Sequence, residues 1–216
     1  MSEQIQHPEK ILVLAGPTAS GKSTITEALL KTFSNLHNFD SYTTRSRRTP
    51  DENDYAGYLT VEEFLELQRQ WFFVEVSKRG DVFYWTWQPT HRNTLMQLDA
   101  NWLESLYEIY KKTNTQIFTV LLNISSGIAL QRACIRAIKQ WKQFTPDFMF
   151  EIMSRVALDR DDMQRIMAWW YSDLQIDLNS EKLTLELEND FDAGKRLVIQ
   201  TFNAWALNQI TNFLNR

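Results

Sequence analysis

The feature that most constrains this chain is the segment Gly16–Ser23, which reads Gly-Pro-Thr-Ala-Ser-Gly-Lys-Ser and follows the apolar run Ile11–Ala15. A glycine, four residues, then glycine, lysine and serine is the pattern of a loop whose backbone N–H groups surround a polyphosphate. The next residues, Thr24–Phe33, carry apolar side chains at helical spacing. A helix that begins there directs the positive end of its dipole toward the same anion. The segment therefore predicts a strand, a phosphate-binding loop and a helix.

The side chains of this loop have distinct expected roles. Lys22 would reach the outer phosphates of a nucleoside triphosphate and serve catalysis, and the Ser23 hydroxyl would bind a magnesium ion. We therefore expect ATP and Mg²⁺ as the ligands of the loop. The residues expected to hold the nucleotide are Gly16, Ser20, Gly21, Lys22, Ser23 and Thr24.

Length and composition set the broad class. The chain has 216 residues, 44% of them hydrophobic, enough for one domain or for one domain with an inserted subdomain. Its net charge of −4 gives no general attraction for nucleic acid, so we expect a small-molecule nucleotide as the partner. The single Cys134 excludes an internal disulfide, and no run of 18 apolar residues or apolar leader is present. These features predict no membrane span and a cytoplasmic, reducing setting, and they leave the oligomeric state open.

Strand and helix patterns alternate along the chain. This order predicts an α/β fold with three layers and a mainly parallel sheet. The predicted strands are residues 11–15, 38–44, 71–76, 81–85, 117–123, 174–178 and 183–187. The predicted helices are residues 23–33, 60–69, 127–140, 148–170 and 193–214, the last with Val198, Phe202, Trp205 and Ile210 on one stripe.

Three local patterns complete this outline. Thr60 followed by Glu63 predicts a reciprocal cap at the start of a helix. Residues 145–147 predict a turn between two helices. Residues 94–109 fit two patterns: one helical period throughout, or a short strand at 94–98 followed by a helix at about 101–111. The sequence leaves both open.

A second group of residues lies between Ser41 and Thr86. Three arginines, Arg45, Arg47 and Arg48, follow a run of hydroxyl side chains, and guanidinium forks bind phosphate with two parallel hydrogen bonds. Glu75 stands in an apolar strand, where its carboxylate can accept two hydrogen bonds from the edge of a guanine-like base. Together with the first loop, these residues indicate sites for two phosphorylated ligands.

Here the sequence resembles the guanylate kinase family. The runs Ser41–Arg48, Phe73–Glu75 and Phe83–Thr86 look like three of its motifs, and the resemblance extends from about Ile11 to Asn179. It implies that Ser41, Glu75 and Thr86 contact the base. It also implies that Arg45, Arg48 and Tyr84 hold the monophosphate, together with Tyr55 or Tyr58. Asp99 would contact the nucleotide if residues 94–98 form a strand.

The same resemblance implies a lid and a donor-base contact. Arg155, in the run Ile152–Arg155, resembles the family's lid arginine, and Arg136, with Arg132 one turn earlier, resembles its upstream partners. Asn179 resembles an asparagine near adenine. The expected organisation is one kinase domain, residues 1–216, with an acceptor-binding subdomain at 39–87 and a lid at about 132–160.

One departure concerns the acceptor site. Trp85 stands where the family has glycine, so we expect its ring near the base, favouring a smaller acceptor. The tail after Glu188 also extends past the usual end of the family.

The residues and the resemblance together predict an enzyme that transfers the γ-phosphoryl group of ATP to a nucleoside monophosphate, GMP or dGMP-like, or to a similar phosphorylated small molecule. Two alternatives remain. The run Gly16–Lys22 also looks like the opening of tRNA prenyltransferases, although their Asp-Ser-x-Gln-x-Tyr signature is absent. Guanylate-kinase-like scaffolding domains bind peptides without nucleotide chemistry, although the intact Lys22 and Ser23 argue against such a module.

Overall fold

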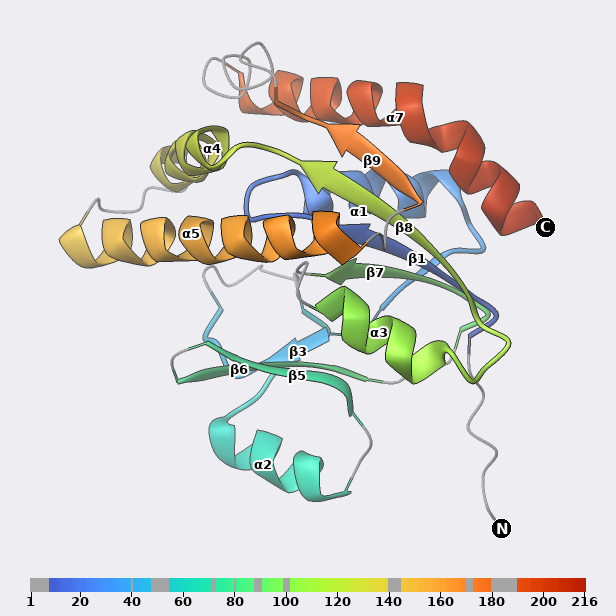
Figure 1. Ribbon diagram of the computed structural model, residues 1–216. Coiled ribbons are helices and arrows are strands. Elements are labelled where there is room, and N and C mark those ends of the chain that lie inside the picture. The colour runs from blue at the N-terminus through green and yellow to red at the C-terminus, as the bar shows by residue number, and fades with distance from the viewer. Residues whose placement is uncertain are drawn as a thin grey trace.

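The chain forms two β-sheets of different size with helices packed on them (Figure 1). The computed structural model describes residues 8–39, 41–47, 55–70, 73–79, 81–87, 91–98, 102–139, 145–169, 173–179 and 190–216. The strands are β1 Lys10–Ala15, β2 His37–Asn38, β3 Ser41–Thr43, β4 Gly57–Tyr58, β5 Phe73–Arg79, β6 Val82–Trp87, β7 Asn93–Leu98, β8 Gln116–Asn123 and β9 Leu174–Asp177. The helices are α1 Lys22–Thr32, α2 Val61–Gln70, α3 Leu103–Tyr110, α4 Ser126–Lys139, α5 Pro146–Trp169 and α7 Phe191–Asn215.

The larger sheet is parallel and has the order β2-β7-β1-β8-β9. Every residue of β1 is buried, as expected for a central strand covered on both faces. Because all five strands run in the same direction, their carboxyl ends share one edge of the sheet. In open parallel sheets that edge, where the strand order reverses, is the usual place for ligands.

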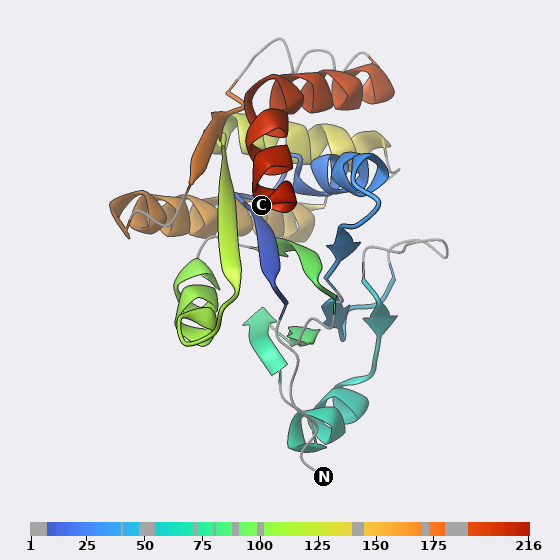
Figure 2. The same ribbon diagram turned by 90° about the vertical axis from the view of Figure 1, so that its right-hand side faces the viewer.

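Helices cover both faces of this sheet and make three layers, as Figures 1 and 2 show. On one face, alternate residues of β1 such as Leu12 and Leu14 pack against α1 and α7. On the other face, Ile11 and Val13 pack against α3. The predicted α/β class with a mainly parallel sheet is therefore confirmed.

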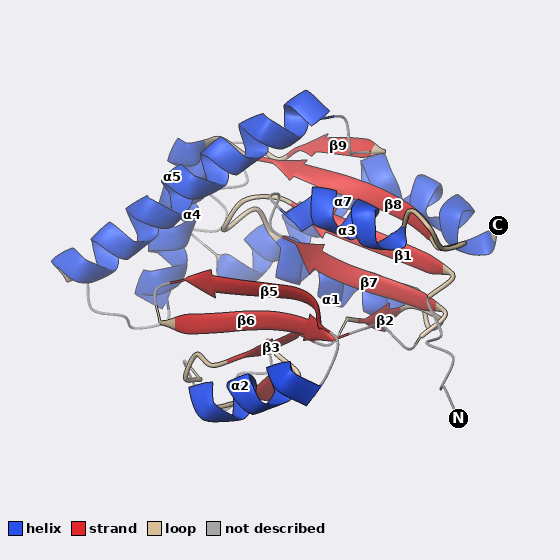
Figure 3. Ribbon diagram, turned by 60° about the horizontal axis from the view of Figure 1, so that its bottom comes forward, coloured by secondary structure: helices blue, strands red, loops and turns tan. Residues whose placement is uncertain are grey.

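The smaller sheet has the order β4-β3-β6-β5 and lies on one side of the larger one (Figure 3). Its pairs β3–β6 and β5–β6 are antiparallel, and β3–β4 is parallel. Helix α2 covers the face turned away from the larger sheet (Figure 1). Thr60 and Glu63 form the predicted reciprocal cap of α2: the Thr60 N–H donates to Glu63 Oε2 at 2.7 Å, and the Glu63 N–H donates to Thr60 Oγ1 at 3.2 Å.

Most predicted elements are present within three residues of their expected bounds, with two exceptions. The stretch 38–44 is not one strand, because β2 joins the larger sheet and β3 the smaller one. Residues 145–147 are not a turn between helices: α5 begins at Pro146, a residue favoured in the first helical turn because it lacks an N–H. Of the two patterns at 94–109, strand β7 followed by α3 is correct. The predicted strand 183–187 lies outside the described residues.

Helix α7 belongs to the core of the larger sheet. Its inward residues are Val198, Phe202, Ala206, Ile210 and Leu214, all buried. Trp205, predicted on this stripe, is 67% exposed, because a four-residue step from Phe202 brings Ala206 inward instead. None of the helices in the described parts of the chain is both long and apolar enough to span a lipid bilayer.

The end of α7 is bound by a buried lysine of β1. Lys10 Nζ donates to the Leu214 carbonyl oxygen at 3.0 Å and lies 5.9 Å from the centre of the Phe213 ring. The last carbonyls of a helix have no partner within the helix and carry partial negative charge, so a cation is favourable there. This contact links the first strand to the last helix.

We predict that Lys10→Ala lowers the free energy of unfolding by about 1.5–3 kcal/mol, because it removes a charged hydrogen bond from a buried carbonyl. Lys112→Ala, at an exposed position, is the control and should change stability little. Urea denaturation measures both. Equal stability of the two variants would show that the contact with Leu214 contributes nothing.

Candidate functional site

The phosphate-binding loop joins the carboxyl end of β1 to the first turn of α1. Gly16 is required by close packing: a Cβ there would lie 2.7 Å from the Leu122 carbonyl oxygen of β8. Gly21 precedes α1 with φ +98°, a conformation that L side chains rarely adopt. The two predicted glycines thus bend the chain where β1, β8 and α1 converge, and α1 points its amino end into the loop.

The polar side chains of the loop are turned to its interior and its rim. Lys22 Nζ donates to the carbonyl oxygens of Gly16 at 2.5 Å and Pro17 at 3.1 Å, so the ammonium group lies over the loop. Ser20 is buried, and its hydroxyl has no hydrogen-bond partner in the described structure. Thr24 is half-buried in the first turn of α1.

Ser23 contacts a residue that sequence reasoning did not single out. Its Oγ donates to Gln97 Oε1 of β7 at 3.3 Å. Gln97 is opposite Leu14 in the β1–β7 ladder, one residue before the end of β7. It is the one exposed residue of an otherwise buried strand, and this polar interruption was the available signal.

The smaller sheet brings the three predicted base contacts into one row. Ser41 of β3 is opposite Thr86 of β6, and Thr86 is opposite Glu75 of β5. Thr86 is buried and Ser41 is half-buried. These residues are up to 45 positions apart in the sequence, and only the strand register makes them neighbours.

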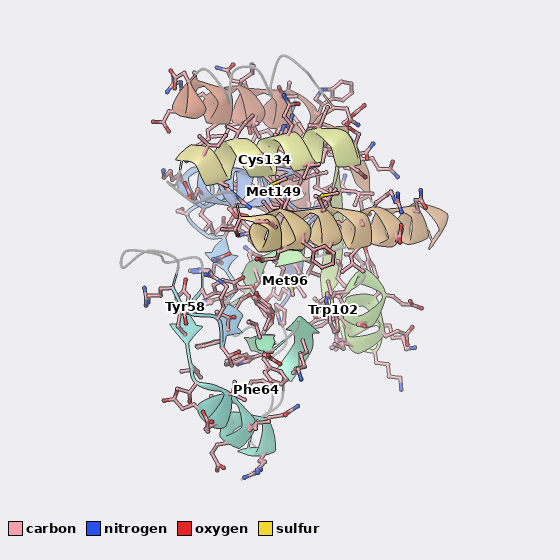
Figure 4. The ribbon with its side chains drawn as sticks, turned by 90° about the vertical axis from the view of Figure 1, so that its left-hand side faces the viewer. Tyr58, Phe64, Met96, Trp102, Cys134 and Met149 are labelled. Atoms are coloured by element: carbon pink, nitrogen blue, oxygen red, sulfur yellow. The ribbon has the colours of Figure 1, made fainter. Side chains whose placement is uncertain are left out.

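The predicted phosphate contacts gather at one end of this sheet. The guanidinium carbon of Arg45 lies 5.4 Å from the centre of the Tyr55 ring and 5.9 Å from that of Tyr58, and the Tyr55 and Tyr84 rings are 5.9 Å apart. The guanidinium carbon of Arg47 lies 4.3 Å from the centre of the Tyr58 ring, which Figure 4 labels at the margin of the sheet. Arg45 is half-buried whereas Arg47 is exposed. Tyr55 and Tyr58 therefore both belong to the cluster around Arg45.

Trp85 does not lie where the sequence predicted. Its ring is 1% exposed and packs 4.7 Å, centre to centre, from Phe64 of α2, which Figure 4 labels. Neighbouring residues of a strand point to opposite faces, so Tyr84 and Thr86 point away from α2. The expectation of a bulky ring beside the base was therefore wrong, because the alternation of β6 directs the ring of Trp85 into the core under α2.

Helix α5 brings Arg155 close to the phosphate-binding loop. Asp159, one turn after Arg155, accepts a hydrogen bond from the Thr18 N–H of the loop at 2.6 Å. Residues four apart lie on the same face of a helix, so Arg155 is on the face directed at the loop. Arg155 is half-buried, and its Nε atom has no hydrogen-bond partner within the described residues. Asp159 was not singled out from the sequence.

The two α4 arginines and Asn179 lie toward the same edge of the sheet. Arg132 is buried and donates from Nη2 to the Leu178 carbonyl oxygen at 2.9 Å, and burial lowers the pKa of its guanidinium from the usual range. Arg136 is half-buried one turn later on α4. Asn179 Oδ1 accepts a hydrogen bond from the Ser125 N–H, which fixes the loop between β8 and α4. Arg132 therefore has a structural contact, at the end of β9.

Three predicted contacts fall wholly or partly outside the described structure. Arg48 and Asp99 lie outside the described residues, as does the side chain of Glu75, whose backbone position is given by the β5–β6 register.

The parallel sheet and its glycine-bounded loop define an α/β domain of the phosphate-binding-loop class. A family model described as guanylate kinase matches residues 8–158, more than half of the chain. The chain therefore belongs to the guanylate kinase family, as its motifs predicted.

Individual relatives agree with this assignment. The chain is 31% identical to a guanylate kinase of Rickettsia typhi over 140 residues, which cover 62% of this chain and 71% of the relative. It is 27% identical to a guanylate kinase of Acinetobacter baylyi over 199 residues, 88% of this chain and 89% of the relative. The crystal structure of guanylate kinase from Anaplasma phagocytophilum matches with a TM-score of 0.54 at 18% identity, covering 93% of this chain and 96% of the other, and it supports the fold.

We predict that Trp85→Ala lowers the free energy of unfolding by about 3–5 kcal/mol, because it opens a cavity beside Phe64. The order of preference among acceptors should not change, because the ring points away from Ser41 and Thr86. Trp205→Ala, at an exposed position of α7, is the matched control. Chemical denaturation and acceptor assays on the folded variant test both parts. A changed acceptor order with unchanged stability would restore the original expectation.

Proposed function

We propose that this protein transfers the γ-phosphoryl group of ATP to GMP or a closely related nucleoside monophosphate. The observation that carries the proposal is that one chain of the guanylate kinase family combines two distinct sites. One is the phosphate-binding loop at the carboxyl edge of the parallel sheet. The other is the row of Ser41, Thr86 and Glu75 with the arginine–tyrosine cluster on the smaller sheet.

In this proposal the loop binds the donor. The phosphates of ATP are held by the amino end of α1 and by backbone N–H groups of the loop up to Thr24, apart from that of Thr18, which donates to Asp159. Lys22 neutralises negative charge on the outer phosphates. Arg155 and Arg136 stabilise the negative charge that develops during transfer. Asn179 lies beside adenine. The acceptor phosphate is already an anion, so no side chain has to act as a general base.

The oxygen donors of the loop fit a magnesium ion. Mg²⁺ prefers hard oxygen ligands and keeps several waters, so a protein needs to supply few of them. Ser23 would hold the ion directly, and the amide oxygen of Gln97 supports the Ser23 hydroxyl. When bound, the ion neutralises phosphate charge and orients the phosphates.

On the acceptor side, Arg45, Arg48, Tyr55 and Tyr84 bind the monophosphate. The cation–π contacts around Arg45 support this role, because they fix the guanidinium group within a rigid aromatic frame. Ser41, Glu75 and Thr86 bind the base edge, and Asp99 contacts the nucleotide.

The proposed organisation is one kinase domain with two accessory parts. Residues 39–87 form the acceptor-binding subdomain, supported by their separate sheet. Residues of about 132–160, from the second half of α4 into α5, form the lid that carries Arg136 and Arg155.

The two alternative functions are not favoured. The matched relatives are named guanylate kinases, which does not support a tRNA prenyltransferase. Lys22 lies over the loop and Ser23 at its rim, where they can serve nucleotide chemistry. This supports an enzyme over a binding module that lacks nucleotide chemistry.

The proposal is tested by measuring ADP formation from ATP and Mg²⁺ with a panel of nucleoside monophosphates and phosphorylated sugars. GMP or dGMP should be the preferred acceptor. Lys22→Ala should abolish transfer, which excludes a contaminating kinase as the source of the activity. Its far-UV circular dichroism spectrum should match that of the wild type, which shows that the variant is folded. A wild-type chain that uses no member of the panel, or a Lys22→Ala variant with wild-type kcat, would overturn the proposal.

We predict that Arg45→Ala raises the KM for the acceptor about ten- to a hundredfold and the KM for ATP much less, because a charged hydrogen bond to phosphate contributes about 1.5–3 kcal/mol. Arg47→Ala is the matched control, since Arg47 is an exposed arginine over the Tyr58 ring of the same cluster. A rise in the KM for ATP instead would mean that Arg45 serves the donor.

We predict that Glu75→Gln changes the order of preference among acceptors. The substitution keeps the shape but exchanges one acceptor oxygen for a donor, and a mispaired buried polar group costs about 1–3 kcal/mol. The measurement is kcat/KM across the nucleotide panel. An unchanged order would remove Glu75 from the base site and leave the phosphoryl-transfer proposal intact.

A further inference from the structure

The contact between Asp159 and Thr18 joins two segments that are 141 residues apart. The Thr18 N–H donates to Asp159 Oδ2 at 2.6 Å, and Asp159 is 5% exposed. A hydrogen bond to an ionised carboxylate is short and about twice as strong as a neutral one. A buried carboxylate also needs such a partner, because its removal from water is costly.

The rest of α5 indicates that this carboxylate has a specific role. Phe150, Met153 and Leu158 are more than half exposed, whereas Val156 and Asp159 are the buried residues among those of α5 whose burial is described. An amphipathic helix normally turns apolar residues inward. Here one of these two buried side chains is charged and binds the backbone of the phosphate-binding loop.

Arg155 lies one turn before Asp159 on the same face of α5. Four residues of α-helix rise about 6 Å, so the two side chains start within reach of the same loop. The bond from Thr18 to Asp159 holds this turn of α5 against the loop, while Val156 of the same helix packs in the core of the larger sheet. The side chain of Arg155 is half-buried beside this contact, and its Nε atom has no hydrogen-bond partner in the described structure.

We propose that Asp159 is a positioning residue for phosphoryl transfer, whose bond to the Thr18 N–H holds α5 so that Arg155 faces the outer phosphates of the donor. The inference rests on the proposed kinase function and adds to it a residue that acts through Arg155. This positioning role depends on the oxygen of Asp159 that accepts the hydrogen bond. It depends less on the negative charge of Asp159, because that charge lies close to the anionic ligand.

Three variants separate this role from packing. Asp159→Ala removes the acceptor and should lower kcat about ten- to a hundredfold, because a displaced catalytic group can cost that much. Asp159→Asn keeps an acceptor oxygen and should retain most of the wild-type kcat, with an equal or lower KM for ATP because a like charge is removed. Asp161→Ala is the control, since Asp161 is exposed two residues away and should behave as wild type.

The decisive measurement is a double-mutant cycle on kcat with Arg155→Ala. If Asp159 acts through Arg155, the double variant with Asp159→Ala is no slower than Arg155→Ala alone. The proposal would be overturned if the double variant lost the product of the two single losses in kcat, or if Asp159→Ala kept the wild-type kcat. An inactive wild-type chain would instead refute the kinase function itself.

A second readout needs no activity and covers the case in which Asp159→Ala does not fold. In the unliganded wild-type protein and in Asp159→Asn, hydrogen exchange at the Thr18 amide should be slower than at an exposed loop amide such as that of Lys112. Exchange of the Thr18 amide as fast as this reference would show that the bond is absent and would overturn the proposal.

Discussion

The burial of β1 between β7 and β8 is the constraint on which the other features depend. All six residues of β1 are buried and pair with parallel neighbours on both sides, so its direction and register are fixed. Its carboxyl end therefore delivers the phosphate-binding loop at one place on the sheet edge. The backbone of β8 passes so close that position 16 cannot carry a Cβ without contact at 2.7 Å. The position of the loop follows from this packing.

The positive character of the site is local. The chain as a whole carries a net charge of −4, yet Lys22 and the amino end of α1 lie at the loop, and Arg155 is on the face of α5 that contacts the loop through Asp159. Arg45 lies in an aromatic frame on the smaller sheet. Such local positive charge suits small anions better than an extended polyanion, which needs a broad basic surface. It also explains why a carboxylate, Asp159, is tolerated close to the loop, where it binds a backbone N–H.

Local patterns predicted the parts of this structure that depend on neighbouring residues. The loop, the cap at Thr60 and the β5–β6 hairpin were all predictable, because each is determined by a few adjacent side chains. What could not be predicted depends on register and on contacts between distant segments. This group includes the packing of the Trp85 ring against Phe64, the contact of Ser23 with Gln97 and the bond from Thr18 to Asp159. The stacked rings of His37 and His91, 4.0 Å apart, arise in the same way, because β2 and β7 are adjacent parallel strands.

We propose that the loop and the smaller sheet bind two nucleotides whose phosphates meet at one centre. A compound in which adenosine and guanosine are joined by five phosphates tests it directly, because linking two ligands that share a centre makes the second binding event intramolecular. Calorimetry should give one compound per chain, an affinity at least about a hundredfold above that of ATP or GMP alone, and displacement by both nucleotides. Binding no tighter than that of ATP, or displacement by only one of the two nucleotides, would show that the two sites do not share a centre.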